Sequence, residues 1–262
     1  MKKLIILAIT LSLFNCKTDQ NKEVEKTINY EQETLDVTTS VYPENMSSIF
    51  AAHGGLDVWN TYKSLSFTMK KPTGDELTVT DLKNRRSYIE TNNFQLGYDG
   101  ETVWLEEHGD FKYEGKPEFY YNLMFYFYAM PFVLADDGIT YENTNALEFE
   151  GKSYPGIKIS YANDVGASPE DEYILYFDTD TKKMAWLGYT VTYFTKEKSK
   201  DWHFIRYTDW QMVNGLILPK TLSWYNAEGF KVLDKRNDLE FTEVKLSKTA
   251  EAASLFKKPM SH

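Results

Sequence analysis

The sequence predicts a mainly β protein of the α+β class, built on an antiparallel sheet that is strongly curved or closed into a barrel. Apolar and polar residues alternate with a period of two through most of the chain after residue 63. Turn residues such as Asn214-Gly215 separate these segments, and no crossover helices lie between them. About eleven strands in such a succession are expected to pair antiparallel. The 262 residues suffice for a domain with a sizeable core.

The composition excludes several other classes of protein. With 19 Tyr, 16 Phe and 6 Trp, the chain can bury enough apolar surface to stay ordered. The low numbers of glycine, proline and cysteine (14, 8 and 1) exclude collagen-like and disulfide-rich chains. Asp and Glu outnumber Lys and Arg by 39 to 29, and the charges are not segregated along the chain. Nucleic acid is therefore not expected as a partner.

The N-terminus has the features of an export signal. Lys2 and Lys3 precede an apolar run from Leu4 to Phe14. As a helix this run would be about 16 Å long, too short for a hydrocarbon core of about 30 Å. We therefore predict a signal peptide at residues 1–15 rather than a membrane span. The single cysteine of the chain, Cys16, follows it immediately.

Cys16 and the residues before it resemble the lipobox of bacterial lipoproteins, in which the cysteine becomes the lipidated first residue. Leu13 fits the apolar position of that motif, whereas Asn15 is more similar to the relaxed lipobox of Bacteroidetes-type lipoproteins. The resemblance implies a lipid anchor in the cell envelope, at the outer membrane of a Gram-negative bacterium. Residues 16–40 are polar and charge-mixed, so we expect the lipidated cysteine to start a flexible tether. Residues 41–262 then form a single domain.

Short helices are expected to open this domain, before the strands begin. Residues 44–53 predict a helix that ends at Gly54-Gly55, and residues 56–60 predict a further short turn that carries Trp59. The alternation then predicts strands in the N-terminal half at residues 64–70, 77–80, 86–91, 94–98 and 102–106. In the C-terminal half it predicts strands at residues 157–161, 173–177, 187–194, 202–210, 216–225, 230–235 and 239–246.

One segment, Phe119–Leu134, breaks the alternation. Only Asn122 and Pro131 in it are neither apolar nor aromatic. Pro117 favours a helix start, and Pro131 is expected to kink or end the helix near Met130. A helix that is apolar on all sides is either buried all round or faces a ligand or a partner. The segment could therefore plug the concave face of the sheet, or it could form the wall or lid of an apolar cavity.

Three stretches carry a resemblance to a known family. The sequence AHGGLDVWNTYKSLSF at residues 52–67, the hairpin YDGETVW at residues 98–104 and the stretch MPFVL at residues 130–134 resemble LolA/LolB-like lipoprotein carriers. The resemblance covers residues 44–246, and none of these motifs is catalytic. It implies a half-open β-barrel with a few helices over its concave face, which enclose an apolar cavity.

No motif for catalysis, for a metal or for a cofactor is found in the sequence. HExxH, GxSxG, P-loop and GxGxxG motifs are absent, and the four histidines are too widely spaced for a helical zinc site. His53 is expected at a helix C-terminus, where a positive charge is favourable, and His203 is expected on a strand. Acidic pairs at Asp136-Asp137 and Asp171-Glu172 are expected in loops.

The leading interpretation is a membrane-anchored lipoprotein without enzymatic activity, whose apolar cavity binds or carries a lipid, an acyl chain or a lipoprotein. The alternative is a surface glycan-binding module with aromatic platforms. A third interpretation is an enzyme whose active site lies in the acidic loops. We expect a monomer whose partners are the membrane, through Cys16, and a lipid ligand. The residues predicted to line the cavity are Phe119, Leu123, Phe125, Phe127, Met130 and Phe132 from the central helix, and Trp59, Phe67, Trp104, Tyr189, Tyr193, Trp202 and Trp224 elsewhere.

Overall fold

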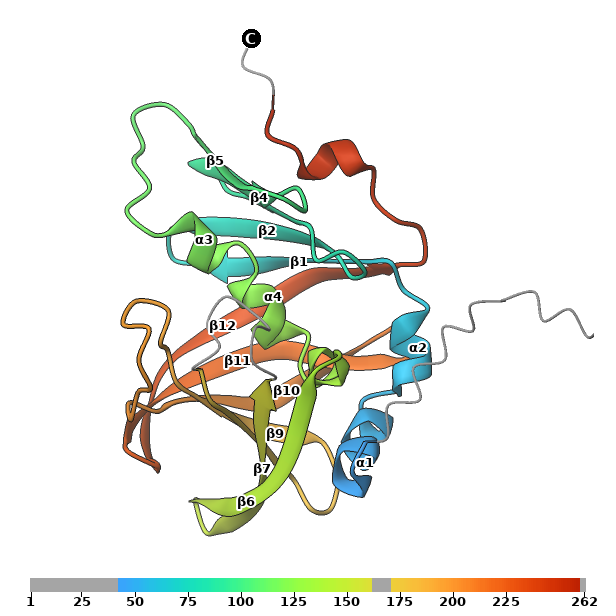
Figure 1. Cartoon of the computed structure of the whole chain (residues 1–262), viewed down its shortest axis with the longest axis vertical. Helices are drawn as coiled ribbons and strands as arrows, with labels where there is room; N and C mark the ends of the chain where they lie inside the picture. Colours follow the sequence, from blue (N-terminus) through green and yellow to red (C-terminus); the bar gives the residue numbers. More distant parts are fainter. Residues whose placement is uncertain (1–41, 162–170, 260–262) are drawn as a thin grey trace, which may run out of the picture. The chain divides into compact units, whose positions relative to one another are not determined.

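The computed structural model describes residues 42–161 and 171–259. The predicted signal peptide, Cys16, the tether and His262 lie outside these described residues. The domain is built on one 12-stranded sheet with the order β5-β4-β3-β2-β1-β12-β11-β10-β9-β8-β7-β6. Figure 1 shows the strands in this arrangement. Because β5 and β6 are its two edges, the sheet is curved but not closed, as the half-open prediction requires.

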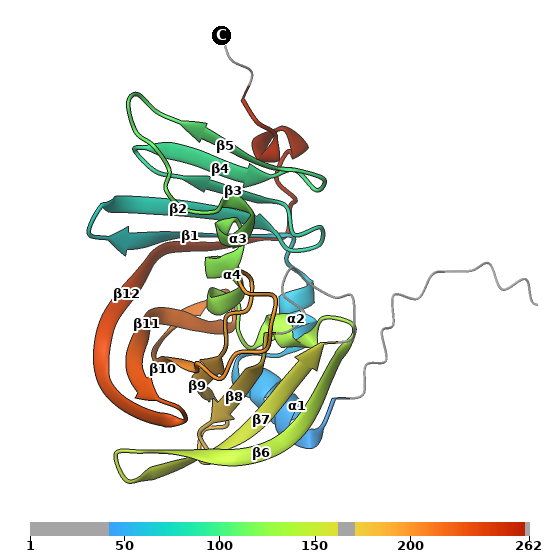
Figure 2. The same ribbon diagram turned by 60° about the vertical axis from the view of Figure 1, so that its left-hand side comes forward.

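All neighbouring strands pair antiparallel. The N-terminal strands are β1 (Ser64–Lys71), β2 (Gly74–Asp81), β3 (Ser87–Glu90), β4 (Phe94–Tyr98) and β5 (Val103–Glu107). The later strands are β6 (Ile139–Phe149), β7 (Lys152–Tyr161), β8 (Tyr173–Phe177), β9 (Met184–Tyr189), β10 (His203–Val213), β11 (Leu216–Glu228) and β12 (Lys231–Ser247). Figure 2 shows how β12 and β11 bend, so that the sheet curves around the central helices.

The largest differences from the predicted strands concern β6, β12 and β9, and β7 also starts at Lys152 rather than at residue 157. β6 was not predicted, because most of its side chains are exposed and its apolar alternation is interrupted by the polar residues 142–145. β12 was predicted as two strands, since its middle residues, 234–238, are polar and exposed, yet it continues as one long strand. β9 ends at Tyr189, whereas the prediction extended to residue 194.

The two N-terminal helices form where the sequence predicts them. α1 (Glu44–Ala52) buries Met46, Ile49 and Phe50. Gly54 and Gly55, which follow it, both have a positive φ, of 106° and 90°. This conformation is free of steric strain only for glycine, so the pair ends the helix as expected. The next helix, α2 (Leu56–Asn60), buries Trp59.

The central apolar segment is not one helix. It forms α3 (Pro117–Tyr120), α4 (Leu123–Tyr128) and the 3₁₀ helix η1 (Phe132–Ala135). α4 ends before Pro131, which has no amide hydrogen to donate to a helix. The break at Asn122 was not predicted; this residue has a φ of −133°, outside the helical range. α3 and α4 lie on the concave side of the curved sheet (Figure 2).

Alternation along the C-terminal strands gives the sheet two apolar faces. On β10, Ile205 and Tyr207 belong to the main core beneath the helices. Phe204, which precedes Ile205 on the strand, belongs to a separate buried cluster on the opposite face. Successive side chains of a strand point to opposite faces, so both faces are apolar here. None of the helices in the described part of the chain is long and apolar enough to cross a membrane.

Candidate ligand-binding pocket

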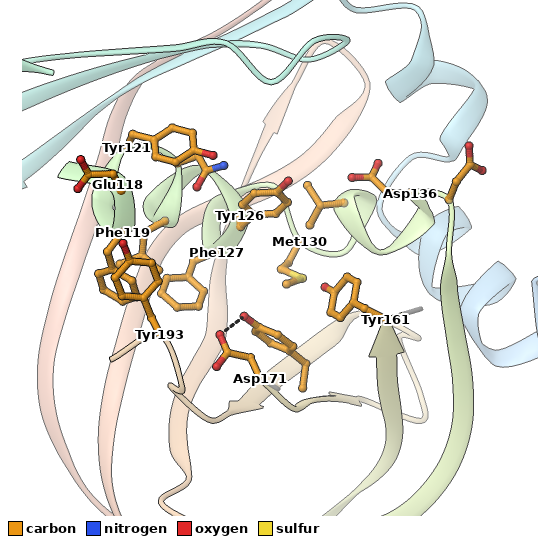
Figure 3. Close-up of a pocket in the computed structure, with 15 residues that line it drawn as sticks. Glu118, Phe119, Tyr121, Tyr126, Phe127, Met130, Asp136, Tyr161, Asp171 and Tyr193 are labelled. Atoms are coloured by element: carbon orange, nitrogen blue, oxygen red, sulfur yellow. Dashed lines mark hydrogen bonds between the residues drawn. The ribbon is translucent and has the colours of Figure 1, made fainter. Parts of the chain in front are cut away.

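A pocket with a volume of about 260 Å³ lies between the central helices and the strands β7 and β8. Its apolar wall comes from α3, α4 and η1 and the residues that join them. This wall consists of Phe119, Leu123, Phe127, Met130 and Val133. Asp171 faces this wall from the sheet side, as Figure 3 shows. Tyr173 on β8 also lines the pocket. The remaining lining residues are Glu118, Tyr121, Asn122, Tyr126, Asp136, Asp137, Tyr161 and Tyr193.

A buried polar network fastens α3 to the sheet. Glu76 on β2 has only 2% of its surface exposed. One of its carboxylate oxygens accepts a hydrogen bond from the Tyr120 hydroxyl at 2.7 Å, and the other pairs with Lys71 Nζ at 2.7 Å. Because a buried carboxylate is stable only when it is paired, this contact holds the start of the pocket wall in place.

α4 is held by contacts on the side that faces away from the pocket. The Tyr128 ring packs between Phe67 and Phe241, with ring centroids 4.4 and 4.6 Å away. The Tyr207 hydroxyl on β10 donates a hydrogen bond to the backbone carbonyl of Phe127 at 2.7 Å. These contacts leave the side chains of Leu123, Phe127 and Met130 at the pocket.

Asp171 accepts three hydrogen bonds at the pocket. Its Oδ1 accepts hydrogen bonds from the Thr192 amide at 2.6 Å and from the Thr192 hydroxyl at 2.7 Å. Its Oδ2 accepts one longer bond, from the Tyr173 hydroxyl at 3.4 Å. Burial raises the pKa of Asp171 above its ordinary value, although the hydrogen bonds from Thr192 oppose this shift.

The rim of the pocket carries an ion pair. Arg85 Nη2 lies 2.6 Å from Asp136 Oδ1, and the guanidinium carbon of Arg85 lies 5.3 Å from the ring centroid of Phe125. Asp136 is thus neutralised by a cation from the β2–β3 turn. Asp137 and Glu118 are exposed.

The structure brings some of the predicted cavity residues together. Phe119, Leu123, Phe127, Met130 and Tyr193 line the pocket. Tyr193 reaches it from the loop after β9 rather than from a strand. Its ring centroid lies 5.1 Å from that of Phe119 and 5.2 Å from that of the exposed Phe194.

The other predicted cavity residues do not line the pocket, because their side chains are packed against protein. Phe125, Phe132, Trp59, Phe67, Tyr189 and Trp224 belong to the main core. Trp59 stacks on Phe132 with ring centroids 4.7 Å apart, and Trp224 Nε1 donates a hydrogen bond to the Tyr189 hydroxyl at 3.2 Å. Phe125 and Phe132 were predicted from the apolar central segment, and the other four because they alternate with polar positions. Both patterns identify side chains that face inwards, but inward-facing positions also fill the core.

Two of the predicted tryptophans lie elsewhere in the domain. Trp104 on β5 donates a hydrogen bond from its indole nitrogen to the Phe256 carbonyl at 2.7 Å, near the other edge of the sheet. Trp202 belongs to the face opposite the pocket, where its ring packs on Phe230 with centroids 4.7 Å apart. Neither residue can reach a ligand in this pocket.

His53 differs from the expected positively charged helix cap. It is completely buried, its Nδ1 donates a hydrogen bond to the Ile217 carbonyl at 3.0 Å, and its Nε2 accepts one from the Met184 amide at 3.1 Å. Burial lowers the pKa of His53 from 6.5 to about 4. The imidazole is therefore neutral at pH 7, and it ties α1 to β9 and β11.

The sequence did not predict which polar residues border the pocket. Both acidic loop pairs had been identified, yet nothing in the sequence showed that Asp136, Asp137 and Asp171 border one pocket. Tyr161 and Tyr173 were taken as members of strands only. The expected apolar cavity is therefore apolar on the helix side alone. In residues 42–161 and 171–259, no cluster of three or more His, Cys, Asp or Glu side chains could hold a metal ion.

The model of a family of unknown function, DUF6503, matches residues 115–240. No curated protein matches the chain at a significant level.

Solved structures resemble the chain over most of its length. A domain from Vibrio parahaemolyticus, described as an outer membrane lipoprotein-sorting protein domain, is 7% identical and has a TM-score of 0.40; the match covers 81% of this chain and 94% of that one. A DUF1329 family protein from Desulfovibrio piger is 8% identical with a TM-score of 0.45, covering 81% and 95%. A LolA superfamily protein from Nitrosomonas europaea is 7% identical with a TM-score of 0.37, covering 74% and 88%. Similarities this distant do not assign a function to the chain.

Proposed function

We propose that this protein is a lipid-anchored binding protein of the bacterial cell envelope, without enzymatic activity, which holds a lipid or another acylated molecule by one chain. The observation that carries the proposal is the pocket wall formed by Phe119, Leu123, Phe127, Met130 and Val133. Apolar walls with a few polar groups are typical of small-molecule sites. At about 260 Å³ the pocket lies near the lower end of such sites, so it suits a single chain better than a whole lipid.

The membrane anchor is the part of the proposal that rests on Cys16. Replacing it (Cys16→Ser) removes the attachment point for lipid, so the protein should move from the membrane to the soluble fraction. Two or more acyl chains at Cys16 would hold the protein firmly, since one chain gives only marginal membrane affinity. If the Cys16→Ser protein stays with the membrane after a carbonate wash, the anchor lies elsewhere.

Titration with an uncharged fluorescent probe that carries one alkyl chain tests the pocket. Leu123 lines the pocket and is only partly buried. Leu123→Ala is therefore expected to cost less than about 1.5 kcal/mol of stability, because the site already borders open space. Leu123→Asp should abolish probe binding, since the carboxylate would be unpaired against an apolar ligand.

Met212 provides the matched control for this experiment. It is 75% exposed and does not line the pocket, so Met212→Asp adds the same charge without affecting the site. Probe binding should survive in this variant. Mass spectrometry of organic extracts of the purified protein would then identify the natural ligand. A wild-type protein that binds no probe, or equal loss in both aspartate variants, would contradict the proposed function.

A glycan-binding surface remains the second candidate function, because the structure has one suitable aromatic pair. Trp202 and Phe230 pack together on the face opposite the pocket, and Phe230 is 53% exposed. Exposed aromatic rings of this kind can stack on sugar rings. The lipid proposal is preferred because the pocket encloses its ligand, whereas this pair offers an open surface.

A further inference from the structure

The charged groups that line the pocket are all acidic. They are Glu118 on α3, Asp136 and Asp137 after η1, and Asp171 before β8, and among the described residues no lysine or arginine lines the pocket. Five tyrosines line it too: Tyr121, Tyr126, Tyr161, Tyr173 and Tyr193. The pocket therefore combines carboxylates with the faces and hydroxyls of aromatic rings.

The cations close to the pocket neutralise only part of this charge. Arg85 is paired with Asp136 at 2.6 Å. Lys196 Nζ lies 4.2 Å from the ring centroid of Tyr193, and its charge acts on Asp171. Asp137 and Glu118 make no ion pair within the part of the chain that the structure describes. A net negative charge thus remains around the pocket.

Asp171 and Tyr161 retain free capacity for polar contacts at the pocket. Thr192 saturates Asp171 Oδ1, but Oδ2 receives only the 3.4 Å bond from Tyr173. The Tyr161 ring meets the Tyr173 ring edge to face, with centroids 5.8 Å apart. Within the described residues the hydroxyl of Tyr161 has no hydrogen-bond partner, and Figure 3 shows this side chain at the pocket beside Met130. The hydroxyl of Tyr161 is therefore available to a ligand in the pocket.

We infer that the ligand of this pocket carries a positively charged nitrogen, held at Asp171 Oδ2 and against the rings of Tyr161 and Tyr173. The inference rests on the proposed function, in which the apolar wall takes the attached chain. An ammonium group is attracted both by a carboxylate and by the face of a tyrosine ring. A ligand with a carboxylate or sulfate head would meet the unneutralised charge of Asp171, Asp137 and Glu118 instead. The ligand class is thus an amphiphile with an amine or ammonium head.

Dodecyl compounds that share one chain and differ in their heads test this inference. The full chain with Cys16→Ser, which keeps its own lipid away from the pocket, is titrated below the micelle concentration with dodecyltrimethylammonium and with dodecyl sulfate. The cationic compound should bind about tenfold tighter or more, which corresponds to about 1.4 kcal/mol. Asp171→Asn should bring the two affinities close to each other, because it removes the charge but keeps an oxygen for the Thr192 amide.

Two further variants separate this effect from damage to the fold and from net charge. Asp137→Asn changes an exposed lining residue, so it should fold normally and lower the preference for the cation by a smaller factor. Glu228→Gln removes an exposed carboxylate that does not line the pocket, and it should leave the preference unchanged.

The outcomes distinguish the inference from the proposed function. If dodecyl sulfate binds as tightly as the cation, the ligand class is wrong and the chain-binding function stands. If neither compound binds, both fail. If tetramethylammonium alone binds as tightly as the dodecyl compound, the cation site is supported and the proposed chain-binding function is overturned. Equal loss of preference in Asp171→Asn and Glu228→Gln would overturn the assignment to Asp171.

Discussion

The two faces of the C-terminal half of the sheet are both rich in aromatic residues, but only one of them borders a pocket. The inner face, under α4, combines a packed core with the pocket. The opposite face carries a buried cluster that we call the outer cluster. Its members are Leu147, Tyr154, Ile174, Tyr176, Ala185, Trp186, Phe204 and Val232.

The covering elements explain the difference. The inner face is covered by α3, α4 and η1, which are short and are interrupted at Asn122 and Pro131. Rigid pieces of this kind do not fill the surface below them evenly. The outer cluster is completed by partly buried side chains of the sheet itself. Arg206 also covers it, with its guanidinium carbon 5.0 Å from the ring centroid of Phe149 and 5.2 Å from that of Trp186. Aromatic content thus predicts a core, while breaks in the covering segment leave room for a pocket.

The largest expected effect is the loss of stability when a large buried side chain is replaced by alanine. This loss, together with probe binding, should differ between the outer cluster and the pocket. Trp186 is completely buried in the outer cluster, so Trp186→Ala should cost about 3–5 kcal/mol. It should leave binding of the uncharged alkyl-chain probe unchanged. Phe127 borders the pocket, and Phe127→Ala should cost about 1–2 kcal/mol less, since the site already lacks packing partners on one side. Denaturant unfolding and probe titration measure both.

A third variant, in the core on the same helix as Phe127, can contradict this comparison. Phe125 has no exposed surface and lies on the same helix as Phe127, so Phe125→Ala serves as the core control within α4. If Phe127→Ala is as destabilising as Phe125→Ala and leaves probe binding intact, the inner face is as closely packed as the outer cluster.

A second, smaller effect depends on pH and concerns the inner region. His53 has a pKa of about 4 in the folded protein and an ordinary value of 6.5. Because the folded pKa is the lower one, the unfolded chain binds a proton first as the pH falls. The contribution of His53 to stability is therefore complete above pH 6.5 and is lost as the pH falls from 6.5 towards 4. The loss should amount to about 2–3 kcal/mol.

The control for this pH effect is His53→Gln. The amide side chain can form hydrogen bonds but does not titrate, so the variant should be less stable at pH 7 and should vary less with pH between 6.5 and 4.5. Unfolding in denaturant at several pH values provides the measurement. An unchanged slope in His53→Gln would show that other groups titrate in this range.

Most of the fold could be predicted because it depends on local patterns. The alternation in β1 and β2 predicts these strands, although the polar residues between the apolar ones, such as Thr78 and Thr80, are buried as well. Gly54-Gly55 indicates a backbone conformation that other residues adopt only with strain. In β6 the alternation is interrupted and most side chains are exposed, so this strand was missed. The helix break at Asn122 lies between Tyr120, which bonds to the sheet through Glu76, and Tyr128, which packs on Phe67 and Phe241. These contacts between distant residues could not be predicted from the sequence.

The pocket could be predicted only on its helix side. Phe119, Leu123, Phe127 and Met130 stand out because the segment is apolar all round. The opposite side combines Tyr161, Asp171 and Tyr173 with residues far away in the sequence. Their convergence depends on the curvature of the sheet, which the alternation of apolar residues does not determine.

The smallest expected effect on stability concerns the exposed part of the outer face, and it also tests the glycan alternative. Phe230 is 53% exposed, so Phe230→Ala should change the stability by about 0.5 kcal/mol or less. Trp202 is partly buried, whereas Trp59, Trp104, Trp186 and Trp224 are buried.

Iodide quenching separates this tryptophan from the buried ones. Trp202 and Trp210 are both partly buried, so Trp202→Phe should remove part of the quenchable fluorescence, while the four buried tryptophans remain protected. In a glycan-binding protein, soluble envelope glycans would shield Trp202 from iodide, and Phe230→Ala would weaken that shielding. We expect no shielding, because the pocket on the inner face is the proposed binding site. Saturable protection of Trp202 by a glycan, lost in Phe230→Ala, would instead make the outer face the functional one.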